Sequence, residues 1–577
     1  MRLSIHGSCT ALLLGLTLNL GACAGQDIEP DDSLFDLHHL LDVRIDIEEG
    51  DWDSLRFERR SLIEIFGPGC HEPIPDAFNY YPANVQIDGE KQQHVGLRAK
   101  GLLGSINPAR PSLKVKLQEY EEDLLYKGHK RFTFNNQNQD VSRLTTCLAY
   151  HIFEKMGVPA SRCNFAALSI NEEDMGVYAN VEPIKKPLLQ RLFGDDSGNL
   201  YEGTVADLRD GFTARIEKKT NEDDDDWRDV DELVAAIESD DNVFLEEIRK
   251  VIDLDAYIRF AAVEAMIGHW DSFSGNANNY YFYHDPISDK FSFLPWGPDG
   301  TFNYRQGAFT QRDDAEPQVA YGNSLLARRL YEHSEIQEHY RDTMRSMLEE
   351  HWDTKELLDI VDQMYGLTAN HVLNPKEDEY LDKVVSVRNF IESRKTILMN
   401  ELDAEPIAFV EELSEEPFCM EKVGDISIEL STTWGSLGAE NPFAEGSGNM
   451  QGNLGSWPID IEYLGPTAGI ENEGEDIDSS SGVAVISALG ALGNDRFIVL
   501  YLTLPKTDIS AGAVLSTTDA KVNAYFLYVD DFESFVPLGW VGPGQIRFSD
   551  QTSTEDGAPF EANIEFELWG EGDSEDE

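Results

Sequence analysis

Acidic and amide side chains gather around one predicted hairpin in the middle of the chain. Asp271 lies a few residues before Asn276, Asn278 and Asn279, and Asp299 follows two short aromatic stretches, YYFYHD and FSFLPW. Phosphoryl transfer from a nucleotide needs an acid that orients the attacking hydroxyl, oxygen ligands for Mg²⁺, and cations for the phosphates. The order of acid, amides, hairpin and second acid fits such a site. A loop rich in Asp and Asn is also a common ordinary turn, so the spacing alone does not separate the two interpretations.

Two predicted strands upstream carry paired cations. In GLRAKG, Arg98 and Lys100 fall on one face, and in SLKVKL, Lys114 and Lys116 fall on the face opposite the apolar residues. In a chain that is short of cations, these strands can form a phosphate-binding wall. The alternative is that both are solvated strand faces.

The elements that must position these groups follow from the hydrophobic pattern. Alternating stretches from about 35 to 130 predict strands, DVSRLTTCLAYHIFEKMG predicts an amphipathic helix that stops at Gly157, and the patterns over 230–270 and 323–402 predict helices. The paired stretches around 163–181 and 280–296 predict hairpins.

The character of the chain changes near residue 403. An acidic linker (403–420) leads into short alternating runs separated by glycine-rich turns (421–570), which predict an all-β, sandwich-like module. An acidic tail (571–577) follows. Four tryptophans of this part are predicted to be core or edge aromatics rather than a sugar-binding platform: Trp434, Trp457, Trp540 and Trp569. The fold class is therefore α+β, with at least two domains in 577 residues.

The charge balance excludes one class of partner. The chain has 46 basic and 107 acidic residues and a formal net charge of −61. Nucleic-acid binding needs a basic footprint, so no nucleic-acid partner is expected, and docking on an anionic lipid surface through charge is not expected either. The acidic excess indicates a strongly solvated surface. A calcium-binding role lacks support because no repeated Asp-x-Asp-x-Asp-Gly loop is present.

The N-terminus has the pattern of an export signal. A short basic segment, the apolar run ALLLGLTLNL and the small residues before Cys23 predict a signal peptide over 1–22, too short to span a bilayer. Leu-Gly-Ala-Cys resembles a bacterial lipobox, which implies cleavage before Cys23, lipidation of its thiol and a tether over 23–34. An ordinary signal peptide that is cut nearby is the alternative. The residues after Cys23 favour the outer membrane, so the expected location is the cell envelope, with the lipid as the only membrane contact.

Four cysteines remain after removal of Cys9 with the signal and lipidation of Cys23. In an exported chain they permit up to two disulfides, with three possible pairings among Cys70, Cys147, Cys163 and Cys419. Cys147 and Cys163 flank a predicted helix and strand, which favours that pair. Pairing of either with Cys70 stays open.

Several motifs together resemble the CotH (spore coat protein H) family of atypical protein kinases. They are YYPANVQIDGEKQQHVGLRAKGLLGS, SLKVKL, the long stretch from FNNQNQD to NVEPI, GNLYEG, HWDSFSGNANNYYFYHD and FLPWGPDGTF, in family order over residues 35–402. The resemblance implies a divergent protein-kinase-like fold that transfers the γ-phosphate of ATP to Ser or Thr of proteins, with Mg²⁺ or Mn²⁺.

The resemblance also implies roles for individual residues. Asp271 matches the catalytic-loop acid, Asn278 and Asn279 match the paired metal or loop-ordering asparagines, and Asp299 matches the later metal-binding acid. Arg98, Lys114 and Lys116 lie in the strands assigned to phosphate contact, and Glu182 matches a glutamate near the nucleotide.

Two departures from the family pattern bear on activity. Trp-Asp-x-Asp of the family reads Trp296-Gly297-Pro298-Asp299 here, so one carboxylate of the metal site is missing. Thr145-Thr146 stands where relatives often carry Arg-Glu, so a glutamate that pairs the phosphate lysine must come from elsewhere. These departures, and the scarcity of ATP outside the cytoplasm, keep an inactive kinase-like scaffold or binding protein open as the alternative. A hydrolase with Asp271 as its base is a third class, without support from a Gly-x-Ser-x-Gly or His-Glu-x-x-His motif.

Overall fold

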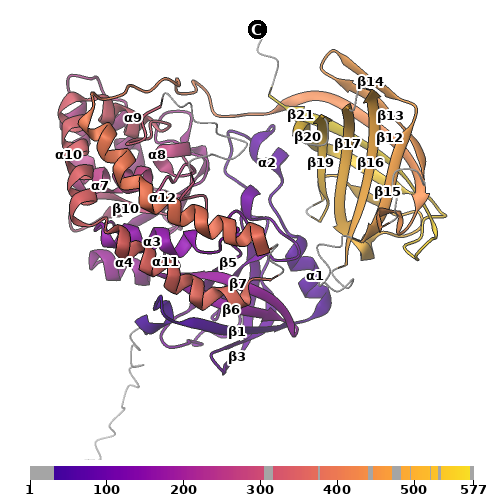
Figure 1. Ribbon diagram of the computed structural model, residues 1–577, viewed down its shortest axis with the longest axis horizontal. Coiled ribbons are helices and arrows are strands. Elements are labelled where there is room, and N and C mark those ends of the chain that lie inside the picture. The colour runs from indigo at the N-terminus through magenta and orange to yellow at the C-terminus, as the bar shows by residue number, and fades with distance from the viewer. Residues whose placement is uncertain are drawn as a thin grey trace, which may run out of the picture.

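The computed structural model describes residues 31–303, 316–373, 377–438, 446–470, 482–493, 496–519, 521–530 and 534–571. Figure 1 shows two bodies side by side, a larger mixed helical and stranded part and a smaller part made of strands. The α+β class is confirmed. The predictions for the signal peptide, for Cys23 and for nearly all of the acidic tail lie outside the described residues. Among the described residues, none of the helices combines the length and apolar character needed to cross a membrane.

The first part of the large body is a closed seven-stranded barrel in the order β1-β2-β3-β4-β5-β7-β6. Alternate apolar residues of these strands point inward, which buries Val43, Val85, Leu97 and Val115 completely or nearly so. The strands are β1 (Leu40–Ile47), β2 (Tyr81–Ile87), β3 (Glu90–Lys100), β4 (Ser112–Lys116), β5 (Arg131–Asn135), β6 (Cys163–Ile170) and β7 (Glu173–Val181).

Helices and a four-stranded sheet form the rest of the large body, around its main core. The sheet has the order β11-β10-β8-β9, from β8 (Asn199–Gly203), β9 (Ile216–Lys218), β10 (Tyr280–Asp285) and β11 (Lys290–Pro295). The helices are α3 (Thr145–Lys155), α4 (Lys186–Phe193), α5 (Arg228–Ile237), α6 (Phe244–Val251), α7 (Leu254–Met266), α8 (Phe273–Asn276), α9 (Leu325–Glu332), α10 (Ser334–Glu350), α11 (Thr354–Thr368) and α12 (Glu377–Asp403). The helical segments and the two hairpins expected from the sequence are present.

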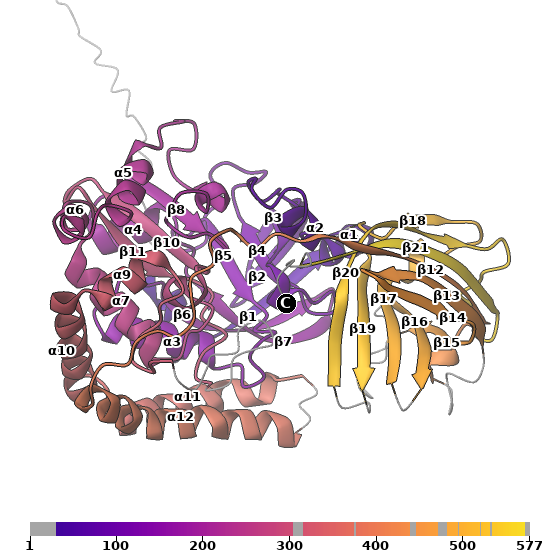
Figure 2. The ribbon, with the colours of Figure 1, turned by 90° about the horizontal axis from the view of Figure 1, so that it is seen from above.

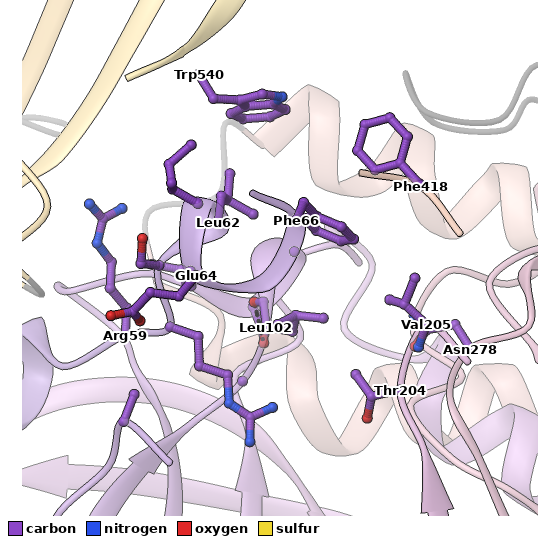
Figure 3. A pocket seen from close by; sticks show the side chains of 18 of the residues that line it. Arg59, Leu62, Glu64, Phe66, Leu102, Thr204, Val205, Asn278, Phe418 and Trp540 are labelled. Atoms are coloured by element: carbon purple, nitrogen blue, oxygen red, sulfur yellow. Dashed lines mark hydrogen bonds between the residues drawn. The ribbon is translucent and has the colours of Figure 1, made fainter. Parts of the chain in front are cut away.

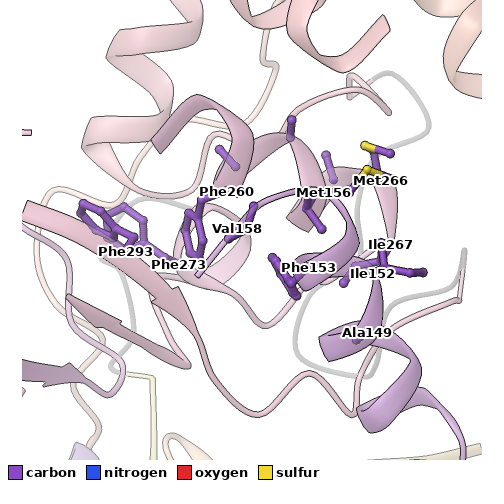
Figure 4. Packing of buried hydrophobic residues seen from close by; sticks show 14 of the residues in the cluster. Ala149, Ile152, Phe153, Met156, Val158, Phe260, Met266, Ile267, Phe273 and Phe293 are labelled. Carbon is purple, nitrogen blue, oxygen red and sulfur yellow. The ribbon is translucent and has the colours of Figure 1, made fainter. Parts of the chain in front are cut away.

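The core of this part joins the elements on either side of Asp271. Phe153 of α3, Phe260 of α7 and Phe273 of α8 pack with Phe293 of β11 and are completely buried or nearly so (Figure 4). Burial of aromatic side chains of this size contributes about 2–3 kcal/mol each. The segment between α7 and β10 is therefore fixed at both ends by the same core.

The C-terminal body is one continuous ten-stranded sheet. Nine of its strands follow the order β14-β13-β12-β21-β20-β19-β17-β16-β15, and β18 pairs with β20. A bridge between Trp434 and Ala468 brings the end of β12 to the edge strand β15, so the sheet curls around its own apolar core. The all-β character is confirmed, whereas the sandwich is not. The strands are β12 (Glu421–Thr433), β13 (Ser447–Leu454), β14 (Trp457–Ile461), β15 (Leu464–Ile470), β16 (Val483–Gly493), β17 (Arg496–Pro505), β18 (Val514–Ser516), β19 (Asn523–Asp530), β20 (Ser534–Phe548) and β21 (Pro559–Gly570).

Two short helices of the large body, α1 (Glu49–Phe57) and α2 (Leu62–Phe66), lie next to the C-terminal sheet (Figure 2). A disulfide joins Cys70, just after α2, to Cys419 in the linker, and Arg59 donates a hydrogen bond to Asn523 of β19. A second disulfide joins Cys147 to Cys163. The two bodies are thus tied together covalently as well as by packing.

Candidate functional site

The loop that carries Asp271 is built by the end of one helix and the start of another. After α7 the chain turns at Gly268, which has φ +67°, and the amide of His269 donates to the carbonyl of Glu264 at 2.8 Å. The Ser272 side chain then accepts from the amide of Gly275 at 3.1 Å and caps α8. Asp271 lies between these two fixed points, at the wall of a cavity.

Three asparagine side chains hold the Asp271 carboxylate. Its Oδ1 accepts from Nδ2 of Asn276 at 2.9 Å and of Asn278 at 3.0 Å. Its Oδ2 accepts from Nδ2 of Asn279 at 2.6 Å, and that group also donates to the Asp271 carbonyl at 2.9 Å. Burial raises the pKa of Asp271, and the three amides oppose this rise. The clamp fixes the direction of a carboxylate that the cavity would otherwise leave free to rotate.

Asp299 lies in the same cavity wall, just beyond the β10–β11 hairpin. Burial raises its pKa to about 7, with nearby Asp271 adding to the rise and Lys100 opposing it. Its carbonyl accepts from Oγ1 of Thr145 at 2.9 Å. Thr145, at the start of α3, thus holds the Asp299 loop.

Gly297 lies where a side chain would be crowded. It has φ +53°, and a Cβ placed on it would lie 2.9 Å from Oδ1 of Asn279. An aspartate at this position would press on the amide clamp of Asp271. The departure from the family pattern is therefore built into the packing of the loop.

Two lysines face the acids across the cavity. Burial lowers the pKa of Lys100 to about 8 and that of Lys114 to about 7. The ammonium of Lys100 lies 5.1 Å from the ring centroid of Trp296. Both lysines are half-buried, and no carboxylate of the described residues lies within ion-pair distance of either, so a bound polyanion would supply the missing countercharge.

Glu202, on β8, adds a carboxylate to the charged side chains that line the cavity near Lys114. Its Oε2 lies 2.8 Å from Nζ of Lys219, and Glu217 lies 2.7 Å from the same nitrogen. Burial opposes ionisation of Glu202, but the charges of Lys219 and Lys114 outweigh it and lower its pKa to about 2. Glu202 is also the leading influence that opposes the loss of the Lys114 proton. A glutamate of β8 thus supplies the negative charge that Thr145-Thr146 of α3 lacks.

The cavity has a volume of about 1830 Å³ and extends from the Asp271 loop to the C-terminal sheet. It brings together Asp271, Asn278, Asn279, Asp299, Lys114 and Arg98 of the residues predicted from the sequence. Arg98 lies 3.6 Å from Asp76.

Two predicted nucleotide contacts lie elsewhere. Lys116 lies on the same face of β4 as Lys114 but two residues farther along the strand, where it does not line the cavity and its ammonium pairs with Glu119 at 2.5 Å. Glu182 is buried between Arg162 and Arg191, at 2.8 and 2.5 Å, and these arginines outweigh the effect of burial and lower its pKa. The structure does not bring either residue into the cavity.

Sequence reasoning missed two of the charged residues that line the cavity, Glu202 and Lys219. Lys100 was predicted to share a strand face with Arg98 in a phosphate-binding wall, and both line the cavity. Glu202 and Lys219 gave no local signal, since their role depends on the pairing of β8 with β9 and on the approach of that sheet to the barrel.

The donor set fits a magnesium or manganese ion. Asp271, Asp299 and the loop asparagines offer oxygen ligands of the type that these ions prefer. The side-chain oxygen of Asn278 already accepts from the Val205 amide at 2.9 Å, so Asp299 and Asn279 are the better placed of the predicted ligands. A bound ion would supply charge neutralisation for phosphate oxygens.

This arrangement of an amide-held acid, a hairpin and a second acid opposite two lysines is of the kinase-like class. The family model described as CotH kinase protein matches residues 97–398, more than half of the chain, and the chain belongs to this family.

Similar proteins include the inner spore coat protein H of Bacillus subtilis (strain 168), 23% identical over 235 residues, which cover 39% of this chain and 64% of that protein. The invasin CotH3 of Rhizopus delemar is 25% identical over 194 residues, covering 31% of this chain and 32% of that protein. The chain thus spans less than two thirds of the length of these relatives. A crystal structure of a Helicobacter pylori proinflammatory kinase, CtkA, aligns with 51% of this chain and 93% of its own, at 11% identity and a TM-score of 0.26, which is too low to support an argument about the fold.

Proposed function

We propose that this chain is an exported atypical protein kinase of divergent kinase-like fold that transfers the γ-phosphate of ATP to Ser or Thr of a protein, with Mg²⁺ or Mn²⁺. The observation that carries the proposal is the fixed Asp271 carboxylate in one cavity with Asp299, Lys100 and Lys114. Family membership supports the same reaction class.

Each residue has a role in this proposal. Asp271 orients the acceptor hydroxyl and takes its proton as the new oxygen–phosphorus bond forms and the bond to ADP breaks. Lys100 and Lys114 bind phosphate oxygens, and Glu202 favours the charged form of Lys114. Asp299 is the principal metal ligand. The metal, when bound, neutralises charge on the transferred group.

The cell envelope is the proposed location, through a lipid on Cys23, with an envelope or surface protein as acceptor and no nucleic-acid partner. The N-terminal lipobox-like sequence and the net charge of −61 support this. Cys23 lies outside the described residues.

The second candidate is an inactive kinase-like scaffold whose C-terminal module binds a partner. The observation that favours it is Gly297. A side chain that restored the missing carboxylate at this position would crowd Asn279, because its Cβ would lie 2.9 Å from Oδ1 of Asn279. In this candidate the cavity does not bind metal and nucleotide together.

The test is nucleotide binding and autophosphorylation with labelled ATP and Mg²⁺ or Mn²⁺, on the chain from Ala24 onward. Asp271→Asn and Asp299→Asn remove the two cavity acids. Asp289→Asn is the matched control, because this acid lies in the turn of the same hairpin and its side chain is 93% exposed. The kinase proposal predicts phosphate incorporation that the first two changes abolish and the third preserves. Absence of metal-dependent nucleotide binding in the parent chain would instead establish the scaffold.

A further inference from the structure

The apolar contact between the two bodies continues to the catalytic loop. Ile63, Ile65 and Phe66 of α2 form a small apolar cluster with Ile74 and Met420. Trp540 and Trp569 of the C-terminal sheet pack against it, and so do Leu102 and Val205 of the large body. Figure 3 shows Trp540 above Leu62 of α2, with Val205 and Asn278 next to each other at the lower right.

Val205 is held in an unfavourable conformation. Its φ is +48°, which is unusual for a β-branched residue because Cβ then crowds the backbone. Such a conformation persists only where the surroundings impose it. Here the surroundings are the apolar cluster and two hydrogen bonds, donated by the backbone amides of Val205 and Ala206.

These hydrogen bonds lead directly to Asp271. The amide of Val205 donates to Oδ1 of Asn278 at 2.9 Å, and Nδ2 of Asn278 donates to the Asp271 carboxylate at 3.0 Å. The amide of Ala206 donates to the carbonyl of Ala277 at 2.8 Å. The loop after β8 thus fixes the orientation of one of the three amides in the clamp.

The helix α2 cannot hold this cluster by itself. It has five residues and no side-chain cap at its N-terminus, and helices of this length are unstable alone. Its position depends on Arg215, which donates to the carbonyls of Ile65 and Cys70, and on the apolar contact with the C-terminal sheet.

We infer that the C-terminal module is a working part of the candidate active site, with Trp540 and Val205 as positioning residues for Asp271. Trp540 presses on the α2 cluster, the cluster holds Val205 in its strained conformation, and Val205 directs Asn278 toward the Asp271 carboxylate. The inference rests on the proposed function only for the catalytic use of Asp271, and the structural link is independent of activity.

The test is hydrogen exchange of backbone amides in the full chain, read in segments 203–206 and 271–279. In Trp540→Ala these segments should exchange about tenfold faster, as expected for loss of one partly buried aromatic contact. Strands β16 and β17 should keep the parent rates, which shows that the module is still folded. Trp540→Phe should restore most of the protection because an aromatic ring remains.

Two further variants complete the test. Leu62→Ala removes the side chain of α2 that faces Trp540 and should speed exchange in the same two segments. It replaces Trp540→Ala as the test if that variant does not fold. Trp457→Ala is the matched control, because Trp457 also lines the cavity from the C-terminal sheet but lies outside the cluster. It should leave both segments unchanged.

Parent exchange rates over 271–279 in both Trp540→Ala and Leu62→Ala would overturn the inference, as would equal loosening by Trp457→Ala. If the parent chain proves inactive, the exchange experiment still tests the structural link between Trp540 and the Asp271 loop. If it is active, kcat should fall in Trp540→Ala while KM for ATP stays near the parent value.

Discussion

Replacement of Glu202 by glutamine tests the electrostatic core of the site. The pKa of Glu202 falls from 4.5 to about 2 on folding, because the attraction of Lys219 and Lys114 outweighs the effect of burial. A change of this size corresponds to about 3.4 kcal/mol of folding stability at neutral pH. The side chain is 19% exposed, so water in the cavity reduces the expected loss to about 2–3 kcal/mol. Removal of one partner from a buried ion pair costs a similar amount, about 3–5 kcal/mol.

The pH dependence of this loss has a definite sign. A carboxyl group whose folded pKa is depressed contributes its full stability above the unfolded value of 4.5, and loses it as pH falls through about 2. The destabilisation by Glu202→Gln should therefore be full at pH 7 and less than half as large at pH 3. Denaturant unfolding of the metal-free chain at both pH values measures it.

Glu217→Gln is the matched control, because Glu217 contacts the same lysine but is more exposed, at 28%. Glu217→Gln should lower the free energy of unfolding by less than about 1 kcal/mol. Equal destabilisation by the two variants, or a Glu202→Gln effect that is the same at pH 3 and pH 7, would refute the reasoning. Because Glu202 also favours the charged form of Lys114, Glu202→Gln should weaken nucleotide binding at pH 7 as well.

Three further changes should have measurable effects. Burial raises the pKa of Asp299 from 3.8 to about 7, so folding stability falls as pH rises from about 4 to about 7 and the buried carboxyl group ionises. Asp299→Asn should therefore stabilise the metal-free protein by about 2–4 kcal/mol at pH 8 and by nearly nothing at pH 4, as measured by thermal unfolding. Gly297→Asp should cost about 1–3 kcal/mol in the same assay, owing to its positive φ and the contact at 2.9 Å. Loss of the disulfide between Cys70 and Cys419 through Cys419→Ser should cost about 2–5 kcal/mol and separate the two bodies into distinct calorimetric transitions.

Each of these expectations has its own contrary result. A gain from Asp299→Asn that is equal at pH 4 and pH 8 would exclude the raised pKa as its cause. Gly211 also has a positive φ, +79°, but has open space around it, so a loss in Gly211→Asp as large as that in Gly297→Asp would exclude the contact with Asn279. A single transition at the parent temperature in Cys419→Ser would show that packing alone joins the bodies.

The sequence determined much of the local structure around the site. The period of the apolar residues located α3, α7 and the β10–β11 hairpin, because one buried face imposes a period of 3.6 on helices and of 2 on strands. The same alternation placed Arg98 with Lys100 on one strand face and Lys114 with Lys116 on one face of the next.

The sequence also determined the order of acid, amides, hairpin and second acid, since these groups lie within about 30 residues of one another. Proximity in the chain restricts such groups to a small volume, so local patterns suffice for them. The family motifs carried the same information.

Tertiary structure alone decided which charges meet. Lys114 faces the cavity while Lys116 pairs with Glu119, and Glu202 enters the cluster from a different sheet. The Lys116–Glu119 pair is local, three residues apart, but no local pattern predicts that Lys114 meets Glu202, because that depends on how the barrel and the β8–β11 sheet pack.

The same is true of the C-terminal module. Its strands were predictable one by one from local alternation. The closure of the curled sheet through Trp434 and Ala468 was not, and the contact of Trp540 with α2 joins residues hundreds of positions apart. Local periodicity specifies which face of an element is buried, but not which distant element covers it. That choice is made by the collective packing of the whole chain, and here it brings a β-module to the edge of the candidate active site.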